Sequence, residues 1–193
     1  WTQLLLYRKD LFDAAGLAAP TTYAAVQQAA QALDSPDRAG FIGATVAGDS
    51  FTGQTFEYWA LANGCQLVDD QGQVTFDSPP CVEALRTYGQ LVRDYGPPGA
   101  QDVDTTRASY FAGKSAMTVW STFILDEMAG LREDAKPSCP ECADDPTFLA
   151  KNTGIVTALQ GPQGSSPTVY GEVTSWVVTA AASTSPAQKF VEY

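Results

Sequence analysis

The chain has 193 residues, of which 45% are hydrophobic, and its 22 acidic and 11 basic side chains give a formal net charge of −11. This composition supports a globular core, but so acidic a surface disfavours nucleic acid and anionic lipid as partners. The chain contains no histidine, which excludes Ser-His-Asp and Cys-His catalysis and histidine-ligated metals. Any catalysis would therefore depend on carboxylates, Tyr, Lys or Cys.

The sequence does not begin with Met, and it stops inside an apparently helical pattern. We therefore expect it to be a piece of a longer protein. No apolar run approaches the roughly 20 residues that span a bilayer, and no signal peptide is visible.

Predicted strands and helices alternate through the first half of the chain. The apolar run Leu4-Leu5-Leu6-Tyr7 is typical of a strand buried on both faces. Gly16 can end the helix that follows it, and Pro20-Thr21-Thr22 can start the next one. The predicted elements here are strands over residues 4–7 and 41–46, helices over residues 9–15, 24–33, 55–62 and 79–95, and a hairpin over residues 66–76.

The second half continues the alternation and adds one long polar stretch. Residues 132–150 resemble a loop and are predicted to be an insertion. The predicted elements here are helices over residues 105–112, 123–131 and from 185 onward, strands over residues 115–119 and 153–159, and an extended segment over residues 169–180. This order predicts an α/β domain with a partly parallel sheet flanked by helices.

The four cysteines are Cys65, Cys81, Cys139 and Cys142. The spacing of Cys139-Pro140-Glu141-Cys142 is that of half a zinc knuckle or of a redox pair. Cys65 and Cys81 lie sixteen positions apart and would make a poor second half of a zinc site. Two structural disulfides in an exported protein are the favoured interpretation, with zinc binding, redox chemistry and free thiols as alternatives.

Four stretches together resemble one family, the sugar-type extracellular solute-binding proteins of bacterial ABC importers. They follow the order of that family and cover almost the whole chain. The stretches are LLLYRKDLFDAAGLAAPTTYAAV (residues 4–26), ALANGCQLVDDQGQVTFDSPPCVEALRTYGQLV (60–92), YFAGKSAMTVWSTF (110–123) and GEVTSWVVTAAASTSPAQKFVEY (171–193).

The resemblance implies that residues 1–193 are a single α/β lobe, the second lobe of a two-lobed receptor with a periplasmic-binding-protein-like (type II) fold. It implies that the receptor captures a sugar or oligosaccharide between its lobes and hands it to the permease subunits of an ABC importer. The missing first lobe would then be a partner within the same chain. The implied location is extracytoplasmic, with a membrane anchor outside these residues, and no cofactor or metal is implied.

The cysteines depart from the family pattern. Cys65 stands where the family usually has a glycine, and Cys81 stands where it usually has a small residue. Because these two residues flank the predicted hairpin, a disulfide between them fits the resemblance. Cys139 and Cys142 would then form a local clip on the insertion.

Sugar sites stack an aromatic ring on the sugar and surround it with amide and carboxyl groups. Trp120 ends a predicted strand where the family often places a stacking aromatic, although it could also be a core residue. Ser121 could offer a hydroxyl to the ligand or could cap the next helix.

Two further segments resemble ligand-contact regions of the family. Glu172 lies in a glycine-rich loop and is a candidate acceptor, and Trp176 follows it in a stretch that could instead be a core strand. Asp49 and Gln54 occupy the loop before a predicted helix and could contact the solute.

The resemblance indicates a receptor and not an enzyme. One alternative is a carboxylate-dependent glycosidase, which needs two acids at a set separation. Another is an adhesion or interaction module. Oligosaccharide turnover would favour the first, and binding of a protein surface would favour the second.

Overall fold

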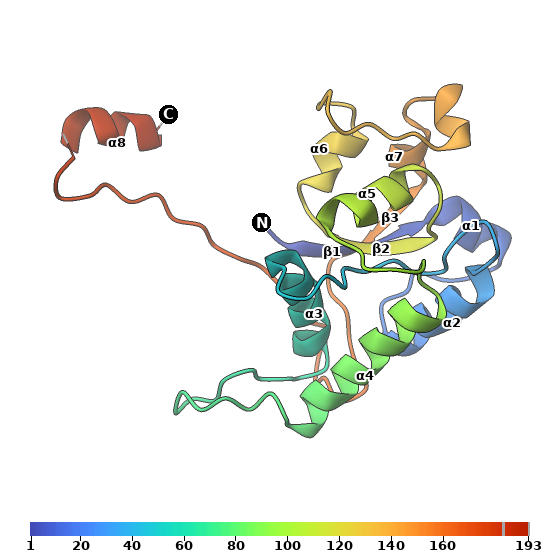
Figure 1. Ribbon diagram of the computed structural model, residues 1–193, viewed down its shortest axis with the longest axis horizontal. Coiled ribbons are helices and arrows are strands. Elements are labelled where there is room, and N and C mark those ends of the chain that lie inside the picture. The colour runs from blue at the N-terminus through green and yellow to red at the C-terminus, as the bar shows by residue number, and fades with distance from the viewer. Residues whose placement is uncertain (183, 193) are drawn as a thin grey trace.

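A computed structural model describes residues 1–182 and 184–192. Three strands, β1 (Gln3–Arg8), β2 (Met117–Ser121) and β3 (Thr153–Val156), form a sheet in the order β2-β1-β3 (Figure 1). Both pairings are antiparallel, with Leu4 opposite Trp120 and Leu5 opposite Val156. The start of β1 therefore lies beside the end of β2.

Helices cover both faces of this sheet. In Figure 1, α5 (Val103–Phe111), α6 (Ile124–Met128) and α7 (Phe148–Asn152) lie above it, whereas α2 (Tyr23–Leu33) and α4 (Pro79–Asp94) lie below. Alternate residues of β1 serve the two layers, because a strand projects successive side chains to opposite faces. Leu4 and Leu6 join the core under α5 to α7, and Leu5 joins the core that contains Tyr58 and Trp59 of α3 (Ser50–Ala62).

The helices begin where the sequence supplies a cap. The side chains of Thr22, Asp49 and Asp102 accept hydrogen bonds from backbone N–H groups in the first turns of α2, α3 and α5. Such caps satisfy donors that the helix itself leaves free. Two further helices are α1 (Lys9–Ala14), which directly follows β1, and α8 (Thr184–Glu192). None of the helices among the described residues is long and apolar enough to cross a membrane.

The prediction of a strand over residues 41–46 is wrong. Within this segment, Ile42 makes one isolated parallel bridge to Thr118 of β2, and Ala39, just before the segment, makes another to Ser115, just before β2. These bridges are parallel but are not part of a strand pairing, and both pairings of the three-stranded sheet are antiparallel. The predicted hairpin over residues 66–76 is likewise reduced to one bridge, between Val68 and Val74.

Residues 132–150 contain more structure than the expected loop. A 3₁₀ turn, η1 (Pro140–Ala143), and the helix α7 lie within or at the end of this stretch. Ala135 and Leu149 are buried in the core beneath α5. The apolar residues in this polar stretch are too widely spaced to show helical periodicity, so the sequence pattern alone misses these turns.

Both cysteine pairs form disulfides. Cys65 is bonded to Cys81 and Cys139 to Cys142, so no cysteine of the described residues is free. The first disulfide ties the end of α3 to the first turn of α4. The pairing that the resemblance implies is confirmed, and the zinc and free-thiol interpretations, which need reduced cysteines, do not match this structure.

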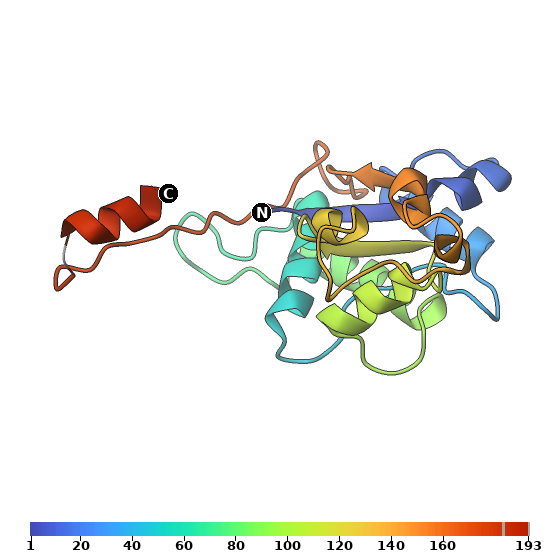
Figure 2. The same cartoon turned by 90° about the horizontal axis from the view of Figure 1, so that it is seen from above.

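The extended segment predicted over residues 169–180 forms no strand, so the core-strand interpretation of the stretch around Trp176 is wrong. After the bridge between Thr2 and Gly171, the chain leaves the sheet without forming a strand and runs to α8, which lies apart from the other helices in both views (Figures 1 and 2). Trp176 is 74% exposed and packs edge-on against Phe190. It is therefore not a core residue of the sheet.

Candidate functional site

A cleft of about 330 Å³ opens at the edge of the sheet where β1 begins and β2 ends. The starts of three helices, α3, α5 and α6, converge there. Open sheets commonly bind ligands beyond strand ends, where loops and helix starts supply polar groups. We call this site the aromatic cleft, and the residues that line it are Trp1, Asp49, Ser50, Phe51, Gln54, Val103, Trp120, Ser121 and Phe123.

Four of the residues that the sequence analysis selects, Asp49, Gln54, Trp120 and Ser121, meet in this cleft. Glu172 joins them at its edge, because the Gln54 side-chain amide donates a hydrogen bond of 3.2 Å to the Glu172 carboxylate. The structure thus gathers residues that lie far apart in the sequence.

Asp49 and Gln54 come from the first turns of α3, which begins earlier than predicted. The Asp49 carboxylate accepts a 2.8 Å hydrogen bond from the backbone N–H of Phe51 and so caps the helix. One of its oxygens is therefore already engaged. Gln54 lies one turn further along and keeps its amide at the surface of the cleft.

Backbone contacts with the start of the chain fix the position of Glu172. The backbone N–H of Glu172 donates to the Trp1 carbonyl at 2.9 Å, and the Trp1 amino group donates to the Glu172 carbonyl at 3.0 Å. This exchange extends the Thr2–Gly171 bridge by one residue. It holds the Glu172 carboxylate beside α3.

Trp120 is a wall of the cleft with little open surface. Its side chain is only 5% exposed, and its indole N–H donates to the Val103 carbonyl at 3.1 Å. The Phe51 ring lies 5.6 Å from the indole ring and the guanidinium carbon of Arg107 lies 5.7 Å from it. With two groups packed against it, Trp120 offers an edge and not a free face to a ligand.

Two other aromatic residues provide more accessible ring surface. Phe123 is 54% exposed, and its ring centroid lies 6.4 Å from that of Trp1. The sequence pattern predicts Phe123 in the next helix and gives no indication of Trp1. The position of Phe123 directly after the strand is a signal that could have identified it, whereas Trp1 reaches the cleft through tertiary contacts, among them the backbone hydrogen bonds with Glu172.

Ser121 is 6% exposed, and its hydroxyl accepts a hydrogen bond of 3.3 Å from the backbone N–H of Phe123. The backbone N–H of Thr122 donates to the Thr2 carbonyl at 2.9 Å. These bonds define the turn from β2 into α6. Ser121 therefore supports the position of Phe123 in this turn, but it does not cap α6, whose N-cap residue is Phe123 and has no side-chain cap hydrogen bond.

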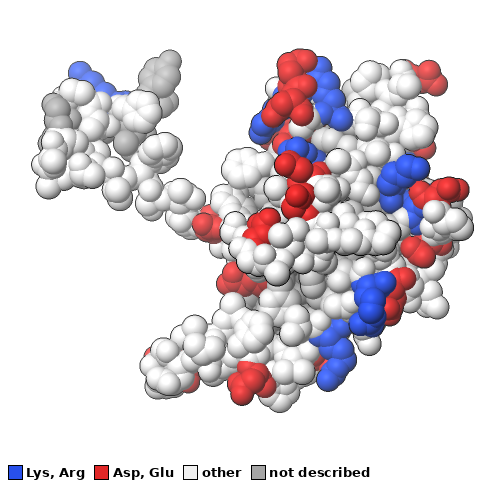
Figure 3. Space-filling model, viewed as in Figure 1, with Lys and Arg blue, Asp and Glu red and all other residues white. Residues whose placement is uncertain are grey.

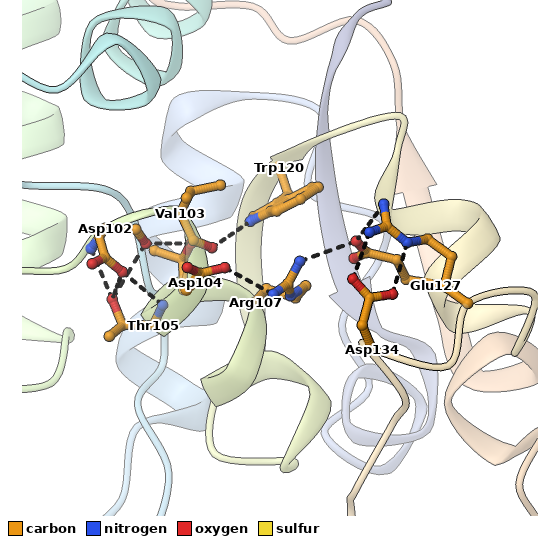
Figure 4. A network of polar contacts seen from close by, with 10 residues as sticks. Asp102, Val103, Asp104, Thr105, Arg107, Trp120, Glu127 and Asp134 are labelled. Atoms are coloured by element: carbon orange, nitrogen blue, oxygen red, sulfur yellow. Dashed lines mark hydrogen bonds and ion pairs between the residues drawn. The ribbon is translucent and has the colours of Figure 1, made fainter.

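A charged network lies behind Trp120 (Figure 4). Arg107 pairs with Glu127 at 3.0 Å and with Asp104 at 2.8 Å, and Arg132 approaches Glu127 at 3.7 Å. Glu127 is 1% exposed. Burial raises the pKa of the Glu127 carboxyl, although the two guanidinium groups oppose this shift.

No Lys or Arg side chain is among the residues that line the cleft. The cleft itself combines aromatic rings, amide and hydroxyl groups and the carboxylates of Asp49 and Glu172. Among the described residues, no group of three or more Cys, Asp or Glu side chains could hold a metal ion. Many of the charged side chains visible in Figure 3 instead pair with one another around the body of the molecule.

Two of the selected residues, Glu172 and Trp176, do not line the cleft, and only Glu172 is connected to it, through its hydrogen bond with Gln54. Trp176 is not connected to it. It lies in the segment between Gly171 and α8 that leaves the body of the molecule.

Comparison with known proteins agrees with this architecture. The chain is 30% identical over its whole length to a protein of Escherichia coli strain K12 named as the ABC transporter periplasmic-binding protein YcjN. It is 31% identical over 140 residues, or 67% of its length, to the mannitol-binding protein of Pseudomonas aeruginosa PAO1. These alignments cover 41% and 32% of the two relatives, so the chain spans less than half of their length.

A crystal structure shows the same fold. It is an ABC transporter solute-binding protein of Agrobacterium radiobacter K84 in complex with ribitol, which superposes with a TM-score of 0.74 at 24% identity. The match covers 99% of this chain and 46% of that protein. The family model described as bacterial extracellular solute-binding protein matches residues 1–193. The chain therefore belongs to the bacterial extracellular solute-binding protein family.

Proposed function

We propose that these residues form one lobe of a receptor that captures a polyol or sugar and delivers it to an ABC importer. The aromatic cleft, beside the paired Gln54 and Glu172 side chains, carries this proposal. The C–H groups of a polyol or sugar pack well on exposed rings, and its hydroxyls pair with amides and carboxylates. Relatives named for mannitol or crystallised with ribitol support this class of solute.

In this proposal Phe123 and Trp1 supply the apolar contact, and Gln54, Glu172 and Asp49 supply the hydrogen bonds. Trp120 and Ser121 shape the wall from behind. Trp176 has a different role, because it lies on the segment that leaves the body.

The exposed segment after Gly171 supports the presence of a first lobe as partner. Residues 173–188 carry no charged side chain, and the apolar side chains of Val173, Trp176 and Phe190 are 92%, 74% and 73% exposed. Exposed apolar surface of this kind marks an interaction site. We propose that this segment packs on the first lobe, which closes over the aromatic cleft.

The proposal places the receptor outside the cytoplasm, where its two disulfides persist. A membrane anchor and contact with permease subunits belong to the same proposal. The receptor binds its solute without turnover, in contrast to the glycosidase alternative.

A thermal-shift screen of the complete native chain, by which we mean the proposed receptor with both lobes, tests this function. Mannitol, ribitol, maltose and a matched amino-acid control are added at rising concentration. Because a ligand that binds only the folded state stabilises it in proportion to ln(1 + [L]/Kd), a polyol or sugar should raise Tm progressively. Hydrolysis of an oligosaccharide, or a Tm that no sugar or polyol changes, would contradict the proposal.

A further inference from the structure

We propose that Arg107 is a positioning residue of the aromatic cleft. Its contact with the indole ring holds Trp120 in place, and its ion pair with Glu127 holds α6 in place. The inference rests on the proposed function for its effect on binding. The positions of the side chains themselves can be tested separately.

Arg107 and Val103 grip the same indole ring from one helix. Both residues belong to α5, and Val103 contributes its backbone carbonyl whereas Arg107 contributes its side chain. The Val103 carbonyl accepts the indole N–H of Trp120, and the Arg107 guanidinium lies over the ring at 5.7 Å. A cation over an indole face is attracted by the ring electrons and restrains the ring.

The other end of the guanidinium anchors α6. One nitrogen of Arg107 donates to Glu127 at 3.0 Å, and another donates to Asp104 at 2.8 Å (Figure 4). Glu127 belongs to α6 and lies one turn after Phe123, the residue before the helix that carries the exposed ring of the cleft. Arg107 thereby connects the wall residue Trp120 with the contact residue Phe123.

Because Glu127 is buried, its ion pair with Arg107 should matter more than an ion pair at the surface. Its side chain is 1% exposed, and one carboxylate oxygen, Oε2, has no hydrogen-bond partner within residues 1–182 and 184–192. A buried carboxylate depends strongly on the charges that remain near it. The second cation, Arg132, is more distant at 3.7 Å and is also paired with Asp134. Without Arg107, the buried Glu127 carboxylate of α6 would keep only the more distant guanidinium of Arg132.

The contacts of Arg107 depend on the planar guanidinium group, which carries several N–H donors in fixed directions. The guanidinium carbon of Arg107 lies 5.7 Å from the centroid of the Trp120 ring, while two of its nitrogens donate to two different carboxylates. A lysine ammonium is a single point of charge, so it cannot make both carboxylate bonds in the same fixed geometry beside the indole. We therefore expect Arg107→Lys to behave as a defective variant.

The experiment compares Arg107→Met with Arg132→Met. Both variants remove a cation from Glu127, but only Arg107 contacts Trp120. The first readout is the indole N–H resonance of Trp120 in ¹H–¹⁵N spectra of the 193-residue chain, assigned with Trp120→Phe. Arg107→Met and Arg107→Lys should shift this resonance, whereas Arg132→Met should leave it in place.

The second readout is mannitol and ribitol affinity of the complete native chain by calorimetry. Arg107→Met should weaken binding about tenfold, and Arg132→Met should change it less than twofold. The double variant Arg107→Met with Glu127→Met removes the unpaired buried charge and should restore Tm. The affinity of this double variant for mannitol and ribitol should stay low, because the contact between residue 107 and the Trp120 indole is still absent.

Two outcomes would overturn the inference. An unshifted Trp120 resonance in Arg107→Met would show that the guanidinium does not position the ring. Affinity that returns together with Tm in the double variant would show that Arg107 contributes stability alone. If the native chain binds neither polyol nor sugar, the proposed function fails, and the resonance still decides whether Arg107 positions Trp120.

Discussion

Phe123 and Trp120 present very different amounts of ring to the aromatic cleft although they are close neighbours in the sequence. Phe123 is 54% exposed and Trp120 is 5% exposed. Phe51 and Arg107 both pack against the indole, with the Phe51 ring and the guanidinium carbon 5.6 and 5.7 Å from it, whereas the Phe123 ring lies 6.4 Å from the Trp1 ring. The contact energy of a bound solute should therefore depend more directly on Phe123.

Replacing Phe123 by alanine should weaken polyol or sugar binding by the complete native chain about tenfold, since an aromatic contact contributes about 1–2 kcal/mol. Its effect on Tm should be small, because the ring is half exposed in the folded state. Leu131→Ala is the matched control, with a 78% exposed side chain outside the cleft. Calorimetry that gives equal affinities for Phe123→Ala and the native chain would remove Phe123 from the site.

The contacts of the Asp145 carboxylate should make the stability of the protein depend on pH. Its carboxylate accepts hydrogen bonds from Thr147 and pairs with Lys151 at 2.9 Å, and these contacts lower its pKa to about 2. Because the pKa is lower in the folded state, the contribution to stability is present above the unfolded pKa of about 3.8 and is lost as pH falls through about 2.

Asp145→Asn should therefore lower Tm at pH 7, and the difference from the native chain should shrink as the pH falls toward 2. Melting curves across this range measure it. Lys151→Met should show the same trend, because it removes the same ion pair. A difference in Tm that stays constant from pH 7 to pH 2 would contradict the assigned contacts.

The sequence predicts the location of the candidate site better than it predicts which aromatic rings there are exposed to solvent. A strand end followed by a helix start identifies the neighbourhood of Trp120 from local pattern alone. The exposure of its indole depends on Phe51 of α3 and on Arg107 of α5, which are distant in sequence. Only the tertiary arrangement decides such a contact, and for that reason Phe123 is missed.

At the scale of elements, the two disulfides close loops of very different length. Cys65–Cys81 joins α3 to α4 across 16 residues, whereas Cys139–Cys142 spans a separation of 3 around η1. A longer closed loop removes more entropy from the unfolded chain. The two disulfides should therefore contribute unequally to stability.

Removing both cysteines of the first pair, with Cys65→Ala and Cys81→Ala, should lower the free energy of unfolding by about 3 kcal/mol in the chain-entropy model. The corresponding change of Cys139 and Cys142 to alanine should lower it by about 2 kcal/mol. Alanine is used because buried serine hydroxyls would add a separate cost. Denaturant titrations under oxidising conditions compare the variants, and the reverse order of stability would contradict the loop argument.

Helices with local start signals follow from the sequence, whereas α7, which lacks such a signal, is missed, and the start of α3 is predicted five residues too late. The cap at Thr22 and the proline at the start of α4 are visible in the letters alone. The segments over residues 41–46 and 169–180 have the apolar composition of strands but do not form them. A strand needs a neighbour with free backbone groups at the right edge, and composition carries no information about that neighbour.

At the scale of the whole molecule, the body and the segment after Gly171 differ in how much apolar surface they bury. The core residues of the sheet and its helices are almost fully buried, whereas Trp176, Val177 and Phe190 are each more than 70% exposed. Figure 2 shows the segment extending away from the body in the second view as well. Surface of this kind gains stability when a partner covers it, and the proposed partner is the first lobe.

Chymotrypsin should therefore cleave after Trp176 much faster in the 193-residue chain than in the complete native chain. Cleavage requires an accessible, locally extended backbone, and packing on a first lobe would remove that access. Cleavage after Phe76, which is 43% exposed beside the Cys65–Cys81 disulfide, serves as the internal control and should proceed at similar rates in both chains. Mass spectrometry of the early fragments measures the two rates. Equal cleavage after Trp176 in both chains would show that this segment stays uncovered, and the lobe that closes the aromatic cleft would then have to be held by other surfaces.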